Sequence, residues 1–267
     1  MKDLVVSDKN KKTPSQNSKV IPKYYIRFSQ AEDLDRLVEF YTDNSHKNVR
    51  QREIDAMKPL IEDGFVAFIE DENGEVVGSS ISYPHKVKEN GVEKVKWLEI
   101  GTARITLNGY ISLFDVMTVS QVLRAYLVEP PEDRFVARMD MPQVRALAER
   151  LGWRSFEPPE ELLDISNSTV DQNKEAGKDR SDGWYQSGVE GLPVMAKFLI
   201  DALESPILTN KKTGDQVEIS IERSKVLKIF KENIKNLTGR DYGSIDKPDM
   251  SKGVAKHRQE WLRRWAR

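Results

Sequence analysis

The side chains that this chain can use for chemistry are mainly carboxylates and hydroxyls, because its 267 residues contain no cysteine. The absence of cysteine excludes disulfides, thiolate nucleophiles and sulfur-ligated zinc or iron sites. The three histidines, His46, His85 and His257, are far apart in sequence, and no HExxH pair sets two of them on one helix face. We therefore expect no metal site and interpret the histidines as surface or loop residues. The sequence also lacks a Walker A loop, a dinucleotide-binding GxGxxG in a strand-turn-helix context and a GxSxG elbow.

A second group of residues that could bind a ligand is basic and lies toward the C-terminus. Arginine and tryptophan alternate there at helical spacing, and a pair of lysines precedes them in a turn. Arginine interleaved with tryptophan can bind phosphates and stack on bases, and it can equally bury its indoles against the protein's own domain or a partner helix. The residues that we expect to contact a partner are Lys211, Lys212, Arg258, Trp261, Arg264 and Trp265.

Charge is distributed unevenly along the chain, although the formal net charge is only −1. Lys and Arg outnumber Asp and Glu in residues 1–23 and 211–267, whereas the acidic residues predominate in 24–190. This asymmetry predicts an acidic body with a basic C-terminal part. The partner of that basic part would be an acidic protein or a nucleic acid.

The sequence shows no membrane or export signal. No apolar run approaches the roughly 18 residues that a membrane helix needs. Residues 1–23 are rich in Lys, Ser and Asn and lack the apolar core of a signal peptide. We expect these residues to form a disordered basic tail and the protein to be cytoplasmic.

The elements that would position functional groups follow from hydrophobic periodicity and turn signals in residues 24–156. The predicted order is β-α-α-β-β-β-α-β-α-β. Strands are expected at 24–28, 65–69, 76–83, 97–106, 134–139 and 153–156, and helices at 30–43, within 50–62, at 116–128 and from 142 to 151. Residues 84–94 are interpreted as a polar loop between two of these strands.

Start and stop signals support the predicted boundaries. Ser29 and Glu32 match a capping box, and Asp115 can cap the third helix. Asn73-Gly74 suits a hairpin turn, and Gly152 is a natural left-handed helix terminator.

The remaining residues predict a linker followed by a smaller module. Residues 157–190 are acidic and polar, which indicates a linker or surface loop. Residues 191–267 are expected to form a basic α+β module with a helix at 192–203, a hairpin of 207–208 with 216–221, a helical stripe at 226–237 and a basic helix from about 252. The predicted fold class is therefore a mixed α/β sheet flanked by helices, followed by this module.

The pattern of residues 24–156 resembles the GNAT N-acetyltransferase superfamily. The most similar stretch is Pro142 to Trp153, PQVRALAERLGW, which is similar to a late helix of the family and its "LGF" exit into the final strand. The hairpin of residues 65–83, with its acidic Asn-Gly turn and Val-Val-Gly strand, looks like the second and third strands of the family. The resemblance covers about half of the chain and implies a GNAT-like acyltransferase domain.

The resemblance also implies a site for acetyl-CoA or another acyl-CoA. Members of the superfamily place the CoA pyrophosphate on backbone N–H groups at the start of the helix after the fourth strand, where the helix N-terminus favours negative charge. The equivalent turn comprises Thr106, Leu107, Asn108, Gly109, Tyr110 and Ile111. The family pattern is Gln/Arg-x-x-Gly-x-Gly/Ala, so Thr106 and Ile111 depart from it.

Two catalytic positions follow from the same resemblance. Glu99 interrupts an apolar strand next to this turn and is the candidate base that deprotonates an amine, directly or through water, since burial would raise its pKa. The alternative interpretation is that Glu99 faces solvent on a half-exposed strand. Ala148 occupies the position of the tyrosine that often protonates the departing thiolate in the family.

Two functions remain open at this point. The first is transfer of an acyl group from acyl-CoA to an amine of a protein or small molecule. The second is a catalytically inactive GNAT-fold binding protein whose basic C-terminal module recognises an acidic protein or nucleic acid.

Overall fold

A mixed β-sheet of nine strands organises the part of the chain that the structure describes. The computed structural model describes residues 20–44, 54–107, 111–128, 130–166, 181–210 and 213–221. The strands are β1 (Lys23–Phe28), β2 (Val66–Asp71), β3 (Val76–Glu89), β4 (Val92–Ile105), β5 (Arg134–Arg138), β6 (Arg154–Ser155), β7 (Trp184–Ser187), β8 (Ile207–Thr209) and β9 (Gln216–Ile221). Their order across the sheet is β6-β7-β5-β4-β3-β2-β1-β9-β8. The β4–β5 and β1–β9 pairs are parallel, and the other neighbours are antiparallel.

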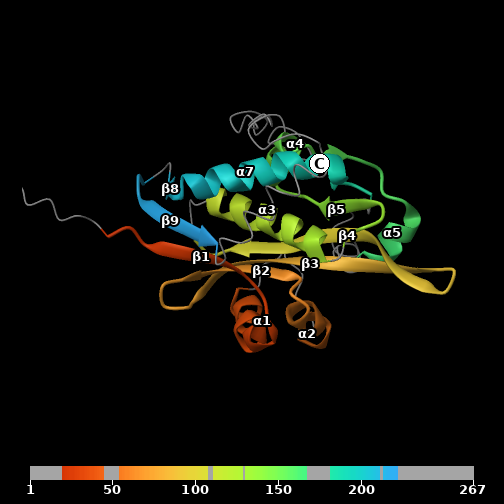
Figure 1. Ribbon diagram of the computed structural model, residues 1–267, viewed down its shortest axis with the longest axis horizontal. Coiled ribbons are helices and arrows are strands. Elements are labelled where there is room, and N and C mark those ends of the chain that lie inside the picture. The colour runs from red at the N-terminus through yellow and green to blue at the C-terminus, as the bar shows by residue number, and fades with distance from the viewer. Residues whose placement is uncertain are drawn as a thin grey trace, which may run out of the picture.

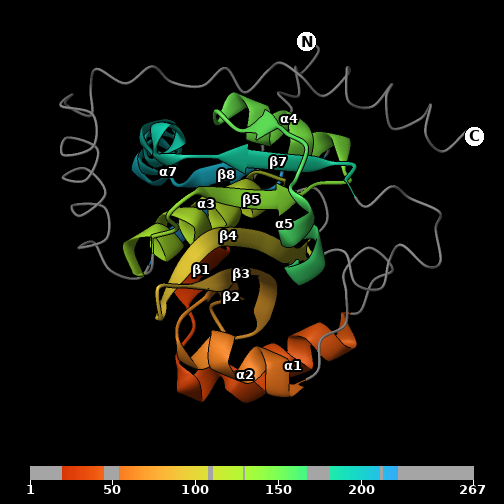
Figure 2. The same ribbon diagram turned by 90° about the vertical axis from the view of Figure 1, so that its right-hand side faces the viewer.

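Helices cover both faces of this sheet (Figures 1 and 2). The α-helices are α1 (Leu34–Asp43), α2 (Ile54–Glu62), α3 (Ile111–Val128), α4 (Pro142–Arg150), α5 (Glu160–Ile165) and α7 (Leu192–Glu204), and short 3₁₀ turns are η1 (Ala31–Asp33) and η2 (Val189–Gly191). Figure 1 shows α3, α4 and α7 above the sheet and α1 and α2 below it. The predicted mixed sheet flanked by helices is confirmed. None of the described helices is both long and apolar enough to cross a membrane.

Three apolar clusters hold the layers together. The largest lies between the sheet and helices α3 and α7, with Leu98, Leu113 and Leu199 among its buried members. A second lies under α1 and α2, and a third packs α5 against Trp97, Val136 and Trp184. Burial of such side chains stabilises the fold by roughly 1.5–3 kcal/mol for each large apolar residue.

The β3–β4 hairpin is longer than the sequence analysis predicts. Residues 84–94 are not a polar loop, because β3 continues to Glu89 and β4 begins at Val92. The turn is made by Asn90 and Gly91, whose φ angles of 50° and 82° lie in the left-handed region that such a turn requires. The local signal was therefore a second Asn-Gly pair, which the sequence analysis did not use.

Two helix starts also differ from the prediction. At the first helix the main-chain N–H of Gln30 donates to Asp33 Oδ2 at 3.0 Å, so Asp33 takes the place predicted for Glu32. Ser29 instead donates through Oγ to the carbonyl of Ile61 at 2.8 Å. Helix α3 begins at Ile111, so Asp115 is not its N-cap and lies inside the helix.

The predicted domain boundaries at 156/157 and 190/191 fall within one sheet. The segment interpreted as a linker contributes α5 and also β7, which lies between β5 and β6. Helix α7 packs on α3, and the predicted β8–β9 hairpin joins β1 in parallel register rather than forming a sheet of its own. The predicted elements at 226–237 and from 252 lie outside the described residues.

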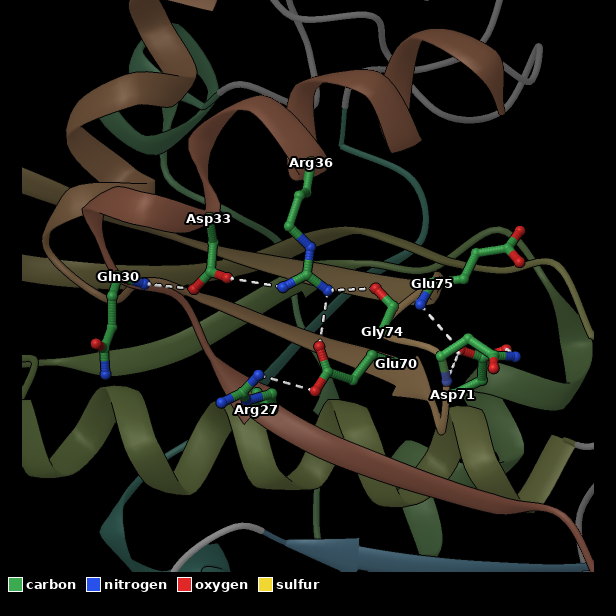
Figure 3. Close-up of polar contacts among 9 residues, drawn as sticks. Arg27, Gln30, Asp33, Arg36, Glu70, Asp71, Gly74 and Glu75 are labelled. Atoms are coloured by element: carbon green, nitrogen blue, oxygen red, sulfur yellow. Dashed lines mark hydrogen bonds and ion pairs between the residues drawn. The ribbon is translucent and has the colours of Figure 1, made fainter.

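An ion-pair network ties the first helix to the β2–β3 hairpin (Figure 3). The Glu70 carboxylate accepts from Arg27 Nη1 at 2.8 Å and from Arg36 Nη2 at 2.7 Å. Arg36 also donates to Asp33 Oδ1 at 3.2 Å and to the carbonyl of Gly74 at 2.7 Å. The network links β1, α1 and β2, and Glu70 at its centre is buried.

Candidate active site

The parallel strands β4 and β5 pair over a short distance and then separate. Their register comprises Trp97 with Arg134, Leu98 with Phe135 and Glu99 with Val136. Beyond Glu99, strand β4 runs on to Ile105 paired with β3 alone, while the last residues of β5 pair with β7. Figure 2 shows β5 between β4 and β7. The β5-facing edge of β4 therefore has no partner strand from residue 100 to 105 among the described residues.

A bulge in β4 lies next to this separation. Ser79 pairs with Arg104 and Ile81 with Gly101, so two residues of β4 stand opposite Ser80 alone. One of them, Thr102, has a φ of 48°, which is rare for a β-branched residue. A bulge bends its strand and increases the local twist, which is consistent with the divergence of β4 from β5.

Two tyrosines fix the unusual backbone of Thr102. The Tyr41 hydroxyl, on α1, contacts the carbonyl of Thr102 at 3.2 Å and Ser79 Oγ at 2.7 Å. The Tyr83 hydroxyl is 2.5 Å from Thr102 Oγ1. A strained backbone persists where its surroundings hold it in place, so α1 and β3 together set the shape of the bulge.

Glu99 is fully buried on the sheet face that also bears Tyr83, its cross-strand partner. Its Oε2 lies 2.8 Å from His85 Nε2 and accepts a hydrogen bond from Ser166 Oγ at 2.9 Å. The interpretation of Glu99 as a solvent-facing residue is therefore wrong. The interpretation of His85 as a surface or loop residue is also wrong, because its exposed fraction is 7% and it lies in β3.

Ser166, at the end of α5, was missed by the sequence analysis. It follows the apolar positions Leu162 and Leu163, which pack α5 on the sheet, and it is itself fully buried. Its sequence signal was a serine that directly ends a short amphipathic segment. Only the packing of α5 shows that this serine reaches Glu99.

The turn predicted to bind CoA is partly described. Thr106 donates to the carbonyl of Val77 through its main-chain N–H at 2.9 Å and through Oγ1 at 3.1 Å. Leu107 packs against the main core, and α3 begins at Ile111. Asn108, Gly109 and Tyr110 lie outside the described residues. The start of the turn is thus anchored to β3 through Thr106.

Asp115 is a second buried carboxyl near this turn. It lies in the second turn of α3 with an exposed fraction of 8%. Burial raises the pKa of Asp115 from 3.8 to about 7, and the positive charge of Arg150, at the end of α4, opposes that rise. The sequence analysis predicted that Asp115 caps a helix. An aspartate in the sequence does not by itself indicate a buried side chain.

A hollow of about 540 Å³ lies elsewhere, beside Lys96 and Trp97 of β4 and the first residue of β5. Lys96, Trp97, Arg134 and Glu161 are among its lining residues, and Glu99 and Thr106 are not. Four of its charged lining residues form ion pairs: Lys96 with Glu161 at 2.8 Å, Arg134 with Glu190 at 2.9 Å, and Glu132 with Lys94. We therefore place the candidate site at the opposite, diverging ends of these strands.

The remaining predicted site residues are those expected to contact a partner. Lys211, Lys212, Arg258, Trp261, Arg264 and Trp265 all lie outside the described residues, so their role in partner binding stays a prediction. Among the described residues, no group of three or more His, Cys, Asp or Glu side chains is arranged to hold a metal ion.

Comparison with solved structures finds matches of low identity over part of the chain. No family model and no curated protein matches the sequence. A Mycobacterium tuberculosis protein solved in complex with CoA is 13% identical with a TM-score of 0.42, and the match covers 60% of this chain and 95% of that one. The diaminobutyrate acetyltransferase of Paenibacillus lautus, in complex with diaminobutyric acid and CoA, is 12% identical with a TM-score of 0.39, over 62% and 95% of the two chains.

A third similar structure names the superfamily. It is a GNAT superfamily phosphinothricin acetyltransferase from Sinorhizobium meliloti in complex with AcCoA, 16% identical with a TM-score of 0.38, and the match covers 48% of this chain and 74% of that one. These likenesses concern the fold of part of the chain.

Proposed function

We propose that this protein is an acyltransferase that moves an acetyl or other acyl group from acyl-CoA to an amine. The observation that carries the proposal is the edge of β4 beyond Glu99, which has no partner strand among the described residues and lies next to a bulge and ahead of a helix start. Two parallel strands that pair at three positions and then part leave an edge to which an extended ligand with amide groups can bind.

The chemistry of acyl-CoA fits this edge. An exposed sheet edge presents backbone N–H and C=O groups that an extended ligand with amides can pair with as an added strand. The pantetheine arm of CoA has two such amides. In the proposed complex the edge of residues 100–105 binds this arm, and the backbone of the 106–111 turn, at the start of α3, receives the pyrophosphate.

The proposed reaction needs a group that removes a proton from the amine. Glu99 lies at the last β4–β5 pair and supplies the negative charge for this step. Its complete burial means that its effect on the amine passes through a neighbouring group or water. Ala148 on α4 is buried and has no acidic proton, so the departing thiolate takes its proton from solvent or from another side chain.

Isothermal titration with acetyl-CoA tests the proposal. We expect binding to the wild-type protein and about tenfold weaker binding to Gly109→Val, because a branched side chain keeps the pyrophosphate away from backbone donors in the turn. Acetyl-pantetheine, which lacks the pyrophosphate, is the matched ligand. It should bind more weakly than acetyl-CoA and should not distinguish the two proteins.

Absence of acetyl-CoA binding at high micromolar protein would reject the enzyme proposal. The alternative, a binding protein that recognises an acidic protein or nucleic acid, would then be tested by salt-dependent binding to DNA or RNA. Counterion release makes such binding weaken steeply with salt. A protein lacking residues 211–267 should lose it.

A further inference from the structure

The buried side chains His85, Glu99 and Ser166 form a connected polar group that the proposed function does not yet explain. They come from β3, β4 and the end of α5, and they lie between the apolar cluster under α1 and α2 and the one under α5. Buried polar groups of this kind are costly unless each is satisfied. Apolar residues would pack such a position at lower cost, so the group calls for a functional reason.

The hydrogen bonds assign a role to each atom. Glu99 Oε2 accepts from Ser166 Oγ and faces His85 Nε2 at 2.8 Å. An ionised carboxylate only accepts hydrogen bonds, so the pair is satisfied when His85 carries its proton on Nε2. The lone pair of the imidazole then lies on Nδ1.

The outward-facing atom of this group belongs to His85. Glu99 and Ser166 have no exposed surface. His85 Nδ1 makes no hydrogen bond with a described residue. With an exposed fraction of 7%, His85 is the member of the group that reaches solvent, so an amine that approaches this face meets the imidazole rather than the carboxylate.

We propose that His85 is the catalytic base that takes the proton from the acceptor amine, with Glu99 and Ser166 as positioning residues behind it. This inference rests on the proposed acyltransferase function and deepens it. The arrangement of a carboxylate behind an imidazole holds the tautomer and stabilises the imidazolium that forms, as in hydrolase triads.

The proton and electron balance of the step is simple. The amine nitrogen forms a bond to the acyl carbon while the carbon–sulfur bond breaks, and the sulfur leaves with that electron pair. One amine proton passes to His85 Nδ1, while the Nε2 proton stays between the ring and Glu99. His85 then releases its proton to solvent, and the thiolate takes one proton from solvent.

The test compares three variants by thiol release from acetyl-CoA, with water or poly-L-lysine as the acceptor. His85→Gln keeps an amide donor toward Glu99 but removes the base, so we expect at least about 10²-fold slower release. Glu99→Gln should also be slow. Lys88→Gln, an exposed change on the same strand, should stay within about twofold of wild type.

Three readouts separate a catalytic from a structural role. Added imidazole should restore part of the activity of His85→Gln and none of that of Glu99→Gln. The dissociation constant for acetyl-CoA, measured by titration, should stay within about threefold of wild type in both. Nitrogen-15 NMR of the three imidazoles should show the Nε2–H tautomer for the signal that His85→Gln removes.

The possible failures are distinguishable. Absence of acetyl-CoA binding by the wild-type protein rejects the acyltransferase function itself. Three outcomes reject the role of His85 when acetyl-CoA binding is normal. They are undiminished thiol release by His85→Gln, no thiol release by the wild type, and an Nδ1–H tautomer of His85. If His85→Gln fails to fold, thiol release by His85→Asn and the tautomer of His85 in the wild-type protein test the same role.

Discussion

Replacing Asp115 with Asn should stabilise the folded protein above about pH 7 by as much as roughly 4 kcal/mol. Burial in α3 raises the pKa of Asp115 from 3.8 to about 7, and a difference of one in pKa between the folded and unfolded states corresponds to about 1.4 kcal/mol. The carboxyl must ionise at high pH in surroundings that disfavour its charge. Asn has the same shape and never ionises, so it removes this cost.

The sign of the pH dependence of the free energy of unfolding follows from whether the folded or the unfolded state binds the proton of Asp115 more tightly. Since the folded-state pKa of Asp115 is the higher one, the folded protein holds more protons between about pH 4 and pH 7, and its stability falls as pH rises through this window. Below about pH 4 both states are protonated and the wild type and Asp115→Asn should be nearly equal. Above about pH 7 the difference should be constant.

Urea unfolding at pH 4, 5.5, 7 and 8 measures this difference. The exposed residue Asp35 on α1 provides the control, and Asp35→Asn should change the free energy of unfolding by less than about 0.5 kcal/mol at every pH. A difference between wild type and Asp115→Asn that does not grow with pH would contradict the buried location of this carboxyl.

Local patterns were enough to predict most of the central sheet. Gly152 ends α4 with a φ of 87°, as its position after an apolar helix face indicates. The Asn73-Gly74 turn and the strands on either side of it also follow from side-chain type alone. Each of these features depends on residues within one turn or one strand, which a sequence displays directly.

Strand β7 could not be predicted in the same way. Residues 184–187 are four positions with the sequence WYQS, buried on both faces, and they show little of the alternation typical of a half-exposed strand. Their place between β5 and β6 depends on a chain path that returns from far along the sequence. The composition of 157–190 therefore indicated a linker, although part of it completes the sheet.

The site was predicted in part for the same reason. Glu99 was found because a carboxylate interrupts an apolar strand. Its partner His85 was not, because their contact depends on the register of the β3–β4 hairpin, which shifts by one residue at Lys96. A one-residue shift moves every following side chain to the other face. The spacing of the histidines in the sequence does not show the register of this hairpin, so it could not predict the contact between His85 and Glu99.

Replacing Glu70 with Ala should lower the free energy of unfolding by about 2 kcal/mol. The Glu70 side chain is 11% exposed and bridges Arg27 and Arg36, which are 36% and 34% exposed. Removal of one partner of a buried ion pair costs about 3–5 kcal/mol, and partial solvation of both guanidinium groups reduces that cost here. Urea unfolding at pH 7 measures the change.

The contrast with an exposed pair makes this prediction specific. Lys58 and Glu62 on α2 lie 3.8 Å apart and are 53% and 41% exposed, so Glu62→Ala should cost less than about 0.5 kcal/mol. Equal losses for the two variants would show that the Glu70 network adds nothing beyond a surface pair. Because the network holds α1 in place, and Tyr41 of α1 holds Thr102 in the bulge of β4, Glu70→Ala should also speed hydrogen exchange in α1 more than in α3.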